Sequence, residues 1–156
     1  MAAAAVQAGT RAGIPVLVDP KVPHVDYYSG ATLITPNHHE AEAVVHLRIR
    51  SDEEAAEAAR RFRERASCGN VLITRGEHGM LLHMPSGDVM LEAEAREVAD
   101  VTGAGDTVIG TMALALAAGG TLVDAARLAN RAAGIVVGKF GPATVSVEEL
   151  SRPSSN

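Results

Sequence analysis

The sequence predicts an α/β fold built on a mostly parallel sheet. Short apolar runs typical of buried strands lie at 15–19, 32–35 and 71–74, and helical patterns separate them. Strands that alternate with helices are the pattern from which parallel sheets are built. With 156 residues, of which 47% are hydrophobic, the chain is long enough for one domain with a core and too short for two ordinary ones.

The first helices are expected from their composition and their end signals. An alanine-rich helix over 2–12 ends near Gly13, and a helix over 41–47 begins after the capping residue Asn37. A charged amphipathic helix over 51–66 opens with acidic residues and closes with arginines, which suits the helix dipole. These elements alternate with the strands as an α/β fold requires.

The turns after the third strand are marked by glycine and proline. Turns at 75–79 and 85–88 join short strands, so this part of the chain is expected to form hairpins. The segment Asp19-Pro20-Lys21, after the first strand, either lines a ligand site at the carboxyl end of the sheet or forms a plain turn.

The C-terminal third is expected to be helical. Residues 98–101 lead as a strand into a glycine-rich turn, and residues 107–119 of the uncharged run 107–123 predict a helix buried on nearly every side. A second helix, of small residues, is expected over 122–137. We expect one partial domain over 1–150 and a frayed tail over 151–156.

Charge and cysteine content argue against several classes of protein. The formal charge of -5 is spread over both signs, so no basic face for nucleic acid is expected. The single cysteine, Cys68, excludes an internal disulfide, lacks partners for a metal site and suggests a reduced cytoplasmic location. The start of the chain does not resemble a signal peptide, and the run 107–123 is too short for a typical membrane span.

A glycine-rich turn before the uncharged run carries the strongest chemical signal. Gly103, Ala104 and Gly105 let the backbone turn tightly, so that consecutive N–H groups can face an anion where a helix begins. Asp106 follows in the first helical turn, where the helix dipole favours its negative charge and where it could accept a proton from a hydroxyl that attacks phosphorus. A common strand-to-helix turn with Asp106 as a simple cap explains the same residues.

Two other phosphate-binding motifs fail on spacing. A dinucleotide fingerprint that starts at Gly103 would need a third glycine at position 108, which is Val108. The run from Gly134 to Phe140 is one residue short of a Walker A loop and lacks its Ser or Thr.

Polar residues also follow the second strand. Asn37 and Glu40 have the spacing of a capping box, which needs no ligand. His38 and His39 lie between them, but Ala43 stands where a zinc-binding H-E-x-x-H motif needs its second histidine. The pattern therefore gives no metal site, and solvated helix histidines are the simplest interpretation.

Five segments together resemble the ribokinase-like (PfkB) carbohydrate kinases. In chain order they are VLVDPK at 16–21, GATLITPN at 30–37, TRGEHGM at 74–80, DVTGAGDTVIG at 100–110 and AGIVVGKFGPATVS at 133–146. Within that family the order is similar to the branch that phosphorylates heptose 7-phosphate in ADP-heptose synthesis, a step towards lipopolysaccharide. The resemblance implies a ribokinase-like three-layer sandwich that uses ATP, Mg²⁺ and, in some members, K⁺.

The resemblance also implies roles for individual residues. Asp106 would be the catalytic base, and the amides of Gly103, Ala104 and Gly105 would bind the transferred phosphate. Further residues would serve the cofactors. The Mg²⁺–ATP side would consist of Asn37, His38, His39 and Glu40, of which Asn37 and Glu40 would act on Mg²⁺ through water. The nucleotide would lie beside Thr74, Gly76 and Asn130, and a monovalent cation would lie at Asp100 and Thr102.

Members of this family are roughly twice as long, and the residues that grip the sugar lie in an N-terminal half that this sequence does not contain. The expected partners are therefore ATP and a sugar phosphate, together with a second copy of the chain or a complementing N-terminal half. Two functions stay open: a sugar kinase, of reduced activity as this chain and acting on heptose 7-phosphate or another sugar, and a non-catalytic remnant or assembly subunit.

Overall fold

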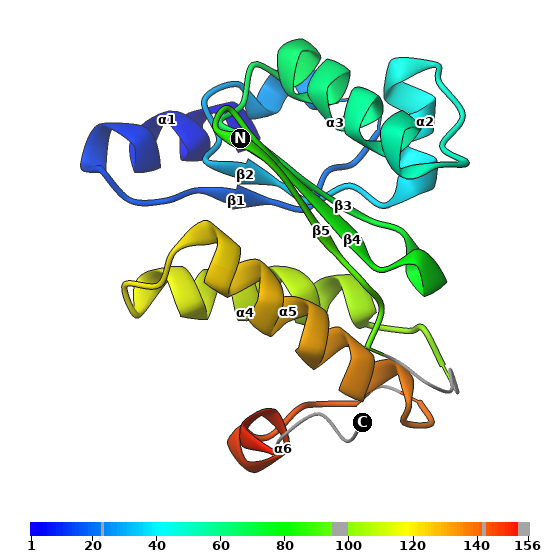
Figure 1. Cartoon of the computed structure of the whole chain (residues 1–156). Helices are drawn as coiled ribbons and strands as arrows, with labels where there is room; N and C mark the ends of the chain where they lie inside the picture. The colour runs from blue at the N-terminus through cyan, green and yellow to red at the C-terminus, as the bar shows by residue number, and fades with distance from the viewer. Residues whose placement is uncertain (23, 95–99, 142, 153–156) are drawn as a thin grey trace. The chain divides into compact units, whose positions relative to one another are not determined.

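The computed structural model describes residues 1–22, 24–94, 100–141 and 143–152. The chain forms two compact units, Met1–Leu91 and Glu92–Asn156, and each is described by itself. The first holds a sheet with its covering helices, and the regular elements described in the second are helices (Figure 1).

A five-stranded sheet forms the centre of the first unit, in the order β1-β2-β3-β4-β5. Its strands are β1 Leu17–Val18, β2 Leu33–Ile34, β3 Asn70–Thr74, β4 Met80–Met84 and β5 Gly87–Leu91. The pairings from β1 to β3 are parallel and those from β3 to β5 are antiparallel, with Leu33 opposite Asn70 and Leu72 opposite Leu82. The predicted α/β fold is confirmed, with a mixed sheet whose antiparallel part consists of the expected hairpins.

The helices of this unit follow the expected capping signals, except that the helix expected over 41–47 begins at His38, directly after Asn37, and ends at Val45. They are α1 Ala2–Ala12, α2 His38–Val45 and α3 Asp52–Ala66, with the 3₁₀ turns η1 Val25–Tyr28 and η2 Gly76–His78. Gly13 ends α1 with a left-handed φ of 68°, and the Ser51 side chain accepts a hydrogen bond from Glu54 N at the start of α3. Local capping chemistry thus fixes where these helices begin and end.

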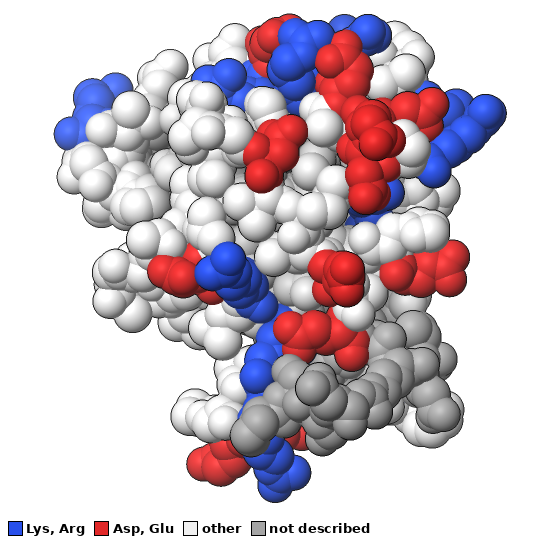
Figure 2. Space-filling view, viewed as in Figure 1, with Lys and Arg blue, Asp and Glu red and all other residues white. Residues whose placement is uncertain are grey.

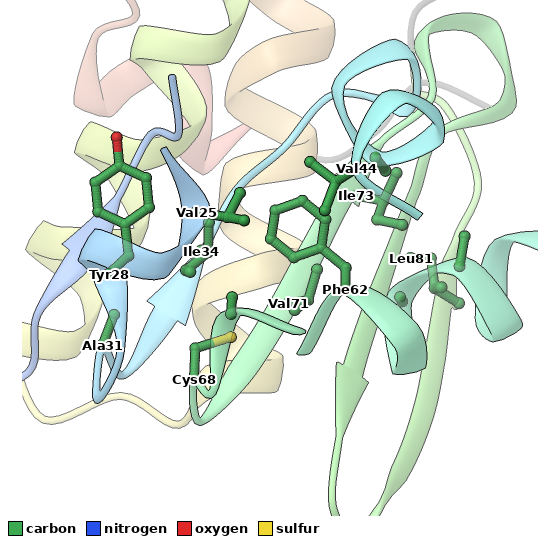
Figure 3. Close-up of a cluster of buried hydrophobic side chains, with 14 of the residues drawn as sticks. Val25, Tyr28, Ala31, Ile34, Val44, Phe62, Cys68, Val71, Ile73 and Leu81 are labelled. Carbon is green, nitrogen blue, oxygen red and sulfur yellow. The ribbon is translucent and has the colours of Figure 1, made fainter. Parts of the chain in front are cut away.

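The core of the first unit lies between the sheet and the helices α2 and α3. Phe62 of α3 is fully buried and lies among Val44, Val71 and Ile73 (Figure 3). Alanines line the rest of the inner face of α3, which lets this helix pack closely on β3 and β4. Its outer face carries ion pairs between Glu57, Arg60 and neighbouring residues, and Figure 2 shows both signs of charge there.

The second unit consists of α4 Ala104–Ala117, α5 Leu122–Val137 and the short α6 Val147–Ser151, and α4 packs along α5. The helix expected over 107–119 corresponds to α4, but the expectation that it is buried on nearly every side is wrong. The uncharged run 107–123 covers most of α4, a turn with Gly119 at φ 87° and the start of α5. Because α4 buries one stripe, including Val108 and Met112, Leu114 on another side is 75% exposed.

Two sequence expectations fall partly outside the described residues. Of the strand expected over 98–101, residues 98 and 99 are not described, and Asp100 and Val101 are not in a strand. Of the tail expected over 151–156, residues 153–156 are not described. No helix among the described residues is long and apolar enough to cross a membrane.

Candidate functional site

The carboxyl ends of three parallel strands bring the polar segments of the first unit to one edge of the sheet. Asp19 follows β1, Asn37 follows β2 and Arg75 follows β3. The backbone N–H of Thr74 donates to Pro36 O at 3.0 Å, and Asn37 and Thr74 form a parallel bridge. The structure therefore places the Asn37 segment beside the Thr74 segment, as a shared site requires.

The predicted capping box is confirmed at the start of α2. Asn37 Oδ1 accepts a hydrogen bond from Glu40 N, and Glu40 Oε2 accepts one from Asn37 N, both at 2.9 Å. The Asn37 amide nitrogen and Glu40 Oε1 take no part in the box. These two side chains can therefore hold the helix start and still offer polar atoms to a ligand.

The two histidines of this helix start differ in their surroundings. His39 is exposed, whereas His38 is half-buried and hydrogen-bonds the backbone of Thr74. Burial, followed by the neighbouring charge of His39, lowers the pKa of His38 below its ordinary value. His38 therefore favours its neutral form and ties α2 to the end of β3. Among the described residues, no group of His, Cys, Asp and Glu is arranged to hold a metal ion.

The loop after β3 is closed by its own backbone. Arg75 N donates to Gly79 O at 2.8 Å, and Gly79 N donates to Gly76 O at 3.0 Å. Gly76 has a φ of 58°, and a Cβ built there would meet nothing within 4 Å. A left-handed backbone and open space let a ligand approach this loop closely.

The Asp19 segment is held in a turn at the same edge. The Asp19 carboxylate pairs with Lys21 Nζ at 3.2 Å, and Lys21 N donates to Tyr28 Oη at 3.2 Å. Both interpretations of this segment, a lining and a plain turn, are compatible with these contacts.

In the second unit, the glycine-rich turn leads directly into α4. Gly103 is the N-cap residue of α4 and has a φ of 78°. Its carbonyl oxygen accepts hydrogen bonds from Thr107 N at 2.9 Å and from Thr107 Oγ1 at 3.0 Å. Ala104 N donates back to Val101 O at 3.2 Å. The first N–H groups of a helix have no partner within the helix, so those of Gly105 and Asp106 are the donors left to face an anion.

Asp106 lies in the first turn of α4 and is exposed. No side-chain cap hydrogen bond is made at this helix start, so Asp106 does not act as a helix cap in this structure. Its carboxylate is thus on the surface beside the N–H groups of the turn. This is the arrangement expected for a base next to a bound anion.

Asp100 anchors the segment before this turn. Asp100 Oδ1 accepts a hydrogen bond from Thr102 N at 2.8 Å, and Asp100 N donates to Val137 O at 3.2 Å. Hydrogen bonds from the side chain and then the backbone of Thr102, with a further one from the backbone of Gly141, lower the pKa of Asp100. This carboxylate is engaged within the turn through Oδ1, and the placement of Asp100 and Thr102 at a monovalent cation stays a prediction.

Asn130 of α5 is buried, with 6% of its surface exposed. Its Nδ2 donates to Glu92 O at 2.7 Å, which ties α5 to the beginning of the second unit. The structure thus gives Asn130 a scaffold contact, and its position beside a nucleotide stays a prediction.

The sequence reasoning missed one buried charge. Arg75 was treated as part of a turn, but its side chain is only 6% exposed and pairs with Asp52 Oδ1 at 2.7 Å. No local pattern in the sequence pointed to it, because its partner Asp52 lies 23 residues away.

The profile of the pfkB family carbohydrate kinases matches residues 1–150. Two relatives are each called bifunctional protein HldE. The one from Ectopseudomonas mendocina is 52% identical to this chain over 148 residues, and the one from Methylococcus capsulatus is 54% identical over 147 residues. Each alignment covers 94% of this chain and 31% of the relative, so the chain spans about a third of the length of the curated relatives it matches.

Solved structures agree with the fold. A ribokinase from Arabidopsis thaliana, complexed with ribose and ATP, has a TM-score of 0.80 at 23% identity, over 90% of this chain and 47% of that one. Phosphofructokinase-2 from Escherichia coli, in complex with potassium, has a TM-score of 0.83 at 20% identity, over 96% of this chain and 49% of that one. These likenesses show a ribokinase-like fold that corresponds to about half of each solved chain. With the family profile matching residues 1–150, the chain belongs to the pfkB family of carbohydrate kinases.

Proposed function

We propose that this chain supplies the ATP side and the catalytic base of a sugar kinase. The observation that carries the proposal is the turn at the start of α4, where an exposed Asp106 lies beside first-turn N–H groups that have no helical partner. The sugar that fits the sequence resemblance best is heptose 7-phosphate, which would be converted to heptose 1,7-bisphosphate. Another sugar or sugar phosphate is the alternative substrate within the family, and a cytoplasmic location is part of the same proposal.

In this mechanism Asp106 accepts the proton of the sugar hydroxyl as that oxygen attacks the γ-phosphorus of ATP. The oxygen–phosphorus bond to the sugar forms while the bond to the leaving ADP oxygen breaks. The N–H groups of the turn stabilise the charge on the transferred phosphoryl group, and each such donor typically contributes about 3 kcal/mol to the transition state. Because Ala104 N already donates to Val101 O, Gly105 carries more of this role than Ala104.

The donors at the start of α2 fit Mg²⁺–ATP. Mg²⁺ prefers oxygen ligands and keeps several waters, so the carboxylate oxygen of Glu40 outside the capping box suits a contact through water. When bound, Mg²⁺ neutralises charge on the phosphates. Asn37, His38 and His39 would line the same side, and Thr74 and the open backbone at Gly76 would lie along the nucleotide.

A coupled assay of ADP release with Mg²⁺, K⁺, ATP and heptose 7-phosphate tests the proposal. We expect any turnover of the chain, alone or with a complementing N-terminal half, to fall at least a hundredfold in Asp106→Asn, because general-base catalysis contributes about 10²–10⁴-fold. The matched control is Asp124→Asn, a first-turn aspartate of the neighbouring helix α5 whose carboxylate accepts from the Thr121 hydroxyl. Equal loss in both variants, or none in Asp106→Asn, contradicts the role of Asp106.

A second candidate function, an assembly subunit without activity of its own, is favoured by the sheet edge. Strand β1 pairs with β2, and no strand among the described residues pairs with its other edge. An open edge can accept a strand from another chain. Sedimentation of this chain with and without the N-terminal segment of an HldE relative tests this candidate, and a monomer that ignores the added segment contradicts it.

A further inference from the structure

The Arg75 guanidinium is a buried charge with one carboxylate partner. Its side chain is 6% exposed, and Nη1 lies 2.7 Å from Asp52 Oδ1 and 3.6 Å from Met90 Sδ. Asp52 is 63% exposed, so water reaches one member of the pair and hardly reaches the other. A buried charge is tolerated when it is paired and becomes costly when its partner is removed. The position of Arg75 therefore depends on Asp52.

The pair joins two elements that are distant in sequence. Asp52 is the first residue of α3, which packs on β3 and β4, whereas Arg75 follows the last residue of β3. The backbone of Arg75 also closes the following loop, because its N–H donates to Gly79 O and its carbonyl accepts from His78 N at 3.1 Å. Arg75 thus closes the loop through its backbone and attaches the loop to the start of α3 through its side chain.

The same loop is attached on its other side. Thr74, the residue before Arg75, donates to Pro36 O, next to the capping box of α2. Thr74 and Gly76, which flank Arg75, are therefore placed between an anchor at Pro36, just before α2, and an anchor at the start of α3. The Arg75 side chain is not free to bind phosphate, since it is buried and its charge faces Asp52.

We infer that Asp52 and Arg75 are positioning residues that hold the Thr74–Gly76 loop in the shape a nucleotide meets. The inference rests on the proposed function, because it takes this loop as the nucleotide side. It adds two residues that act through Thr74 and Gly76 without touching the ligand. Breaking the pair is expected to weaken nucleotide binding while the core of the unit, which is centred on Phe62, stays intact.

The test uses the whole chain and two independent readouts. The first is cleavage by trypsin after Arg75, followed by mass spectrometry, because a buried and paired arginine is protected in the native chain. The second is isothermal titration with Mg²⁺–ATP. The variants are Asp52→Asn, which removes the charge and keeps the shape, Asp52→Glu, which restores a carboxylate, and Glu57→Gln, which breaks ion pairs with Arg60 and Arg61 on the same helix.

In Asp52→Asn we expect cleavage after Arg75 to be at least fivefold faster and the Kd for Mg²⁺–ATP to rise at least fivefold. Asp52→Glu should recover most of both effects, and Glu57→Gln should change neither. On an Arg75→Gln background, Asp52→Asn should add no further loss of affinity, because the interacting partner is gone.

Each other outcome contradicts the inference in a distinct way. Unchanged cleavage in Asp52→Asn means that the pair does not anchor the loop. Faster cleavage with unchanged affinity, in a chain that binds Mg²⁺–ATP, means that the anchor has no effect on the nucleotide. If the unsubstituted chain does not bind Mg²⁺–ATP, the proposed function fails and the positioning role falls with it, whereas the cleavage result still reports on the anchor.

Discussion

The capping box at the start of α2 allows stability and nucleotide binding to be separated in one experiment. Asn37 and Glu40 each make a 2.9 Å hydrogen bond that stabilises the helix start, and each is also proposed to serve Mg²⁺–ATP. Serine is as good an N-cap as asparagine, and glutamine replaces glutamate in a capping box. The variants Asn37→Ser and Glu40→Gln therefore keep the cap and change the groups offered to a ligand.

The expected magnitudes follow from these bonds. Asn37→Ala loses the cap and should lower the free energy of unfolding by about 1 kcal/mol, which is a fall of about 0.5 M in the urea midpoint at an m-value of about 2 kcal/mol/M. Asn37→Ser should stay within about 0.5 kcal/mol of the unsubstituted chain. Both Asn37→Ser and Glu40→Gln should weaken Mg²⁺–ATP about tenfold, which corresponds to about 1.4 kcal/mol.

Urea unfolding followed by circular dichroism and isothermal titration with Mg²⁺–ATP measure the two quantities. Thr121→Ala is the matched control, because it removes the N-cap bond to Asp124 at the start of α5, a helix end that carries none of the proposed site residues. It should cost as much stability as Asn37→Ala and leave the affinity unchanged. If Asn37→Ser and Glu40→Gln bind Mg²⁺–ATP as the unsubstituted chain does, the two residues are caps and nothing more.

Two further predictions concern titratable groups in the first unit. Burial raises the pKa of the Cys68 thiol to about 11, so iodoacetamide at pH 8 should label Cys68 far more slowly in the native chain than in urea. Equal labelling rates, measured by mass spectrometry, would contradict the buried position. The pKa of His38 is lowered from 6.5 by burial, so the unfolded state binds more protons and the free energy of unfolding should decrease as the pH falls from 6.5 through the folded pKa. Urea curves between about pH 5 and 7.5 should show this slope reduced in His38→Gln and retained in His78→Gln, a histidine that is exposed in η2.

Features that depend on neighbouring residues could be predicted from the sequence. The end of α1 at Gly13, the start of α3 near Ser51 and the box of Asn37 with Glu40 are confirmed, because each is decided within about one turn of helix. The family was also predictable, since its motifs depend on the order and spacing of a few residues. The hairpin after β3 followed from the glycines at 76 and 79 in the same way.

Features that depend on distant contacts were not predictable. Composition showed that residues 107–123 are apolar, but which face of α4 is buried depends on α5. The Asp52–Arg75 pair joins residues 23 apart, and no local pattern distinguishes a buried arginine from one on a turn. The contact of Asn130 with Glu92 joins residues 38 apart and was not predictable for the same reason.

The structure also ranks the candidate residues by how fully their positions are explained without a ligand. The capping box accounts for Asn37 and Glu40, the contacts with Thr102 and Val137 account for Asp100, and each of these side chains has a structural task. Asp106 differs: it is exposed, makes no cap, and among the described residues it has no hydrogen bond or ion pair through its side chain. Exposed polar residues without a structural task are the ones whose substitution leaves the fold unchanged. Loss of turnover in Asp106→Asn would for that reason report on chemistry, whereas the same loss at Asp100 would first have to be separated from damage to the turn.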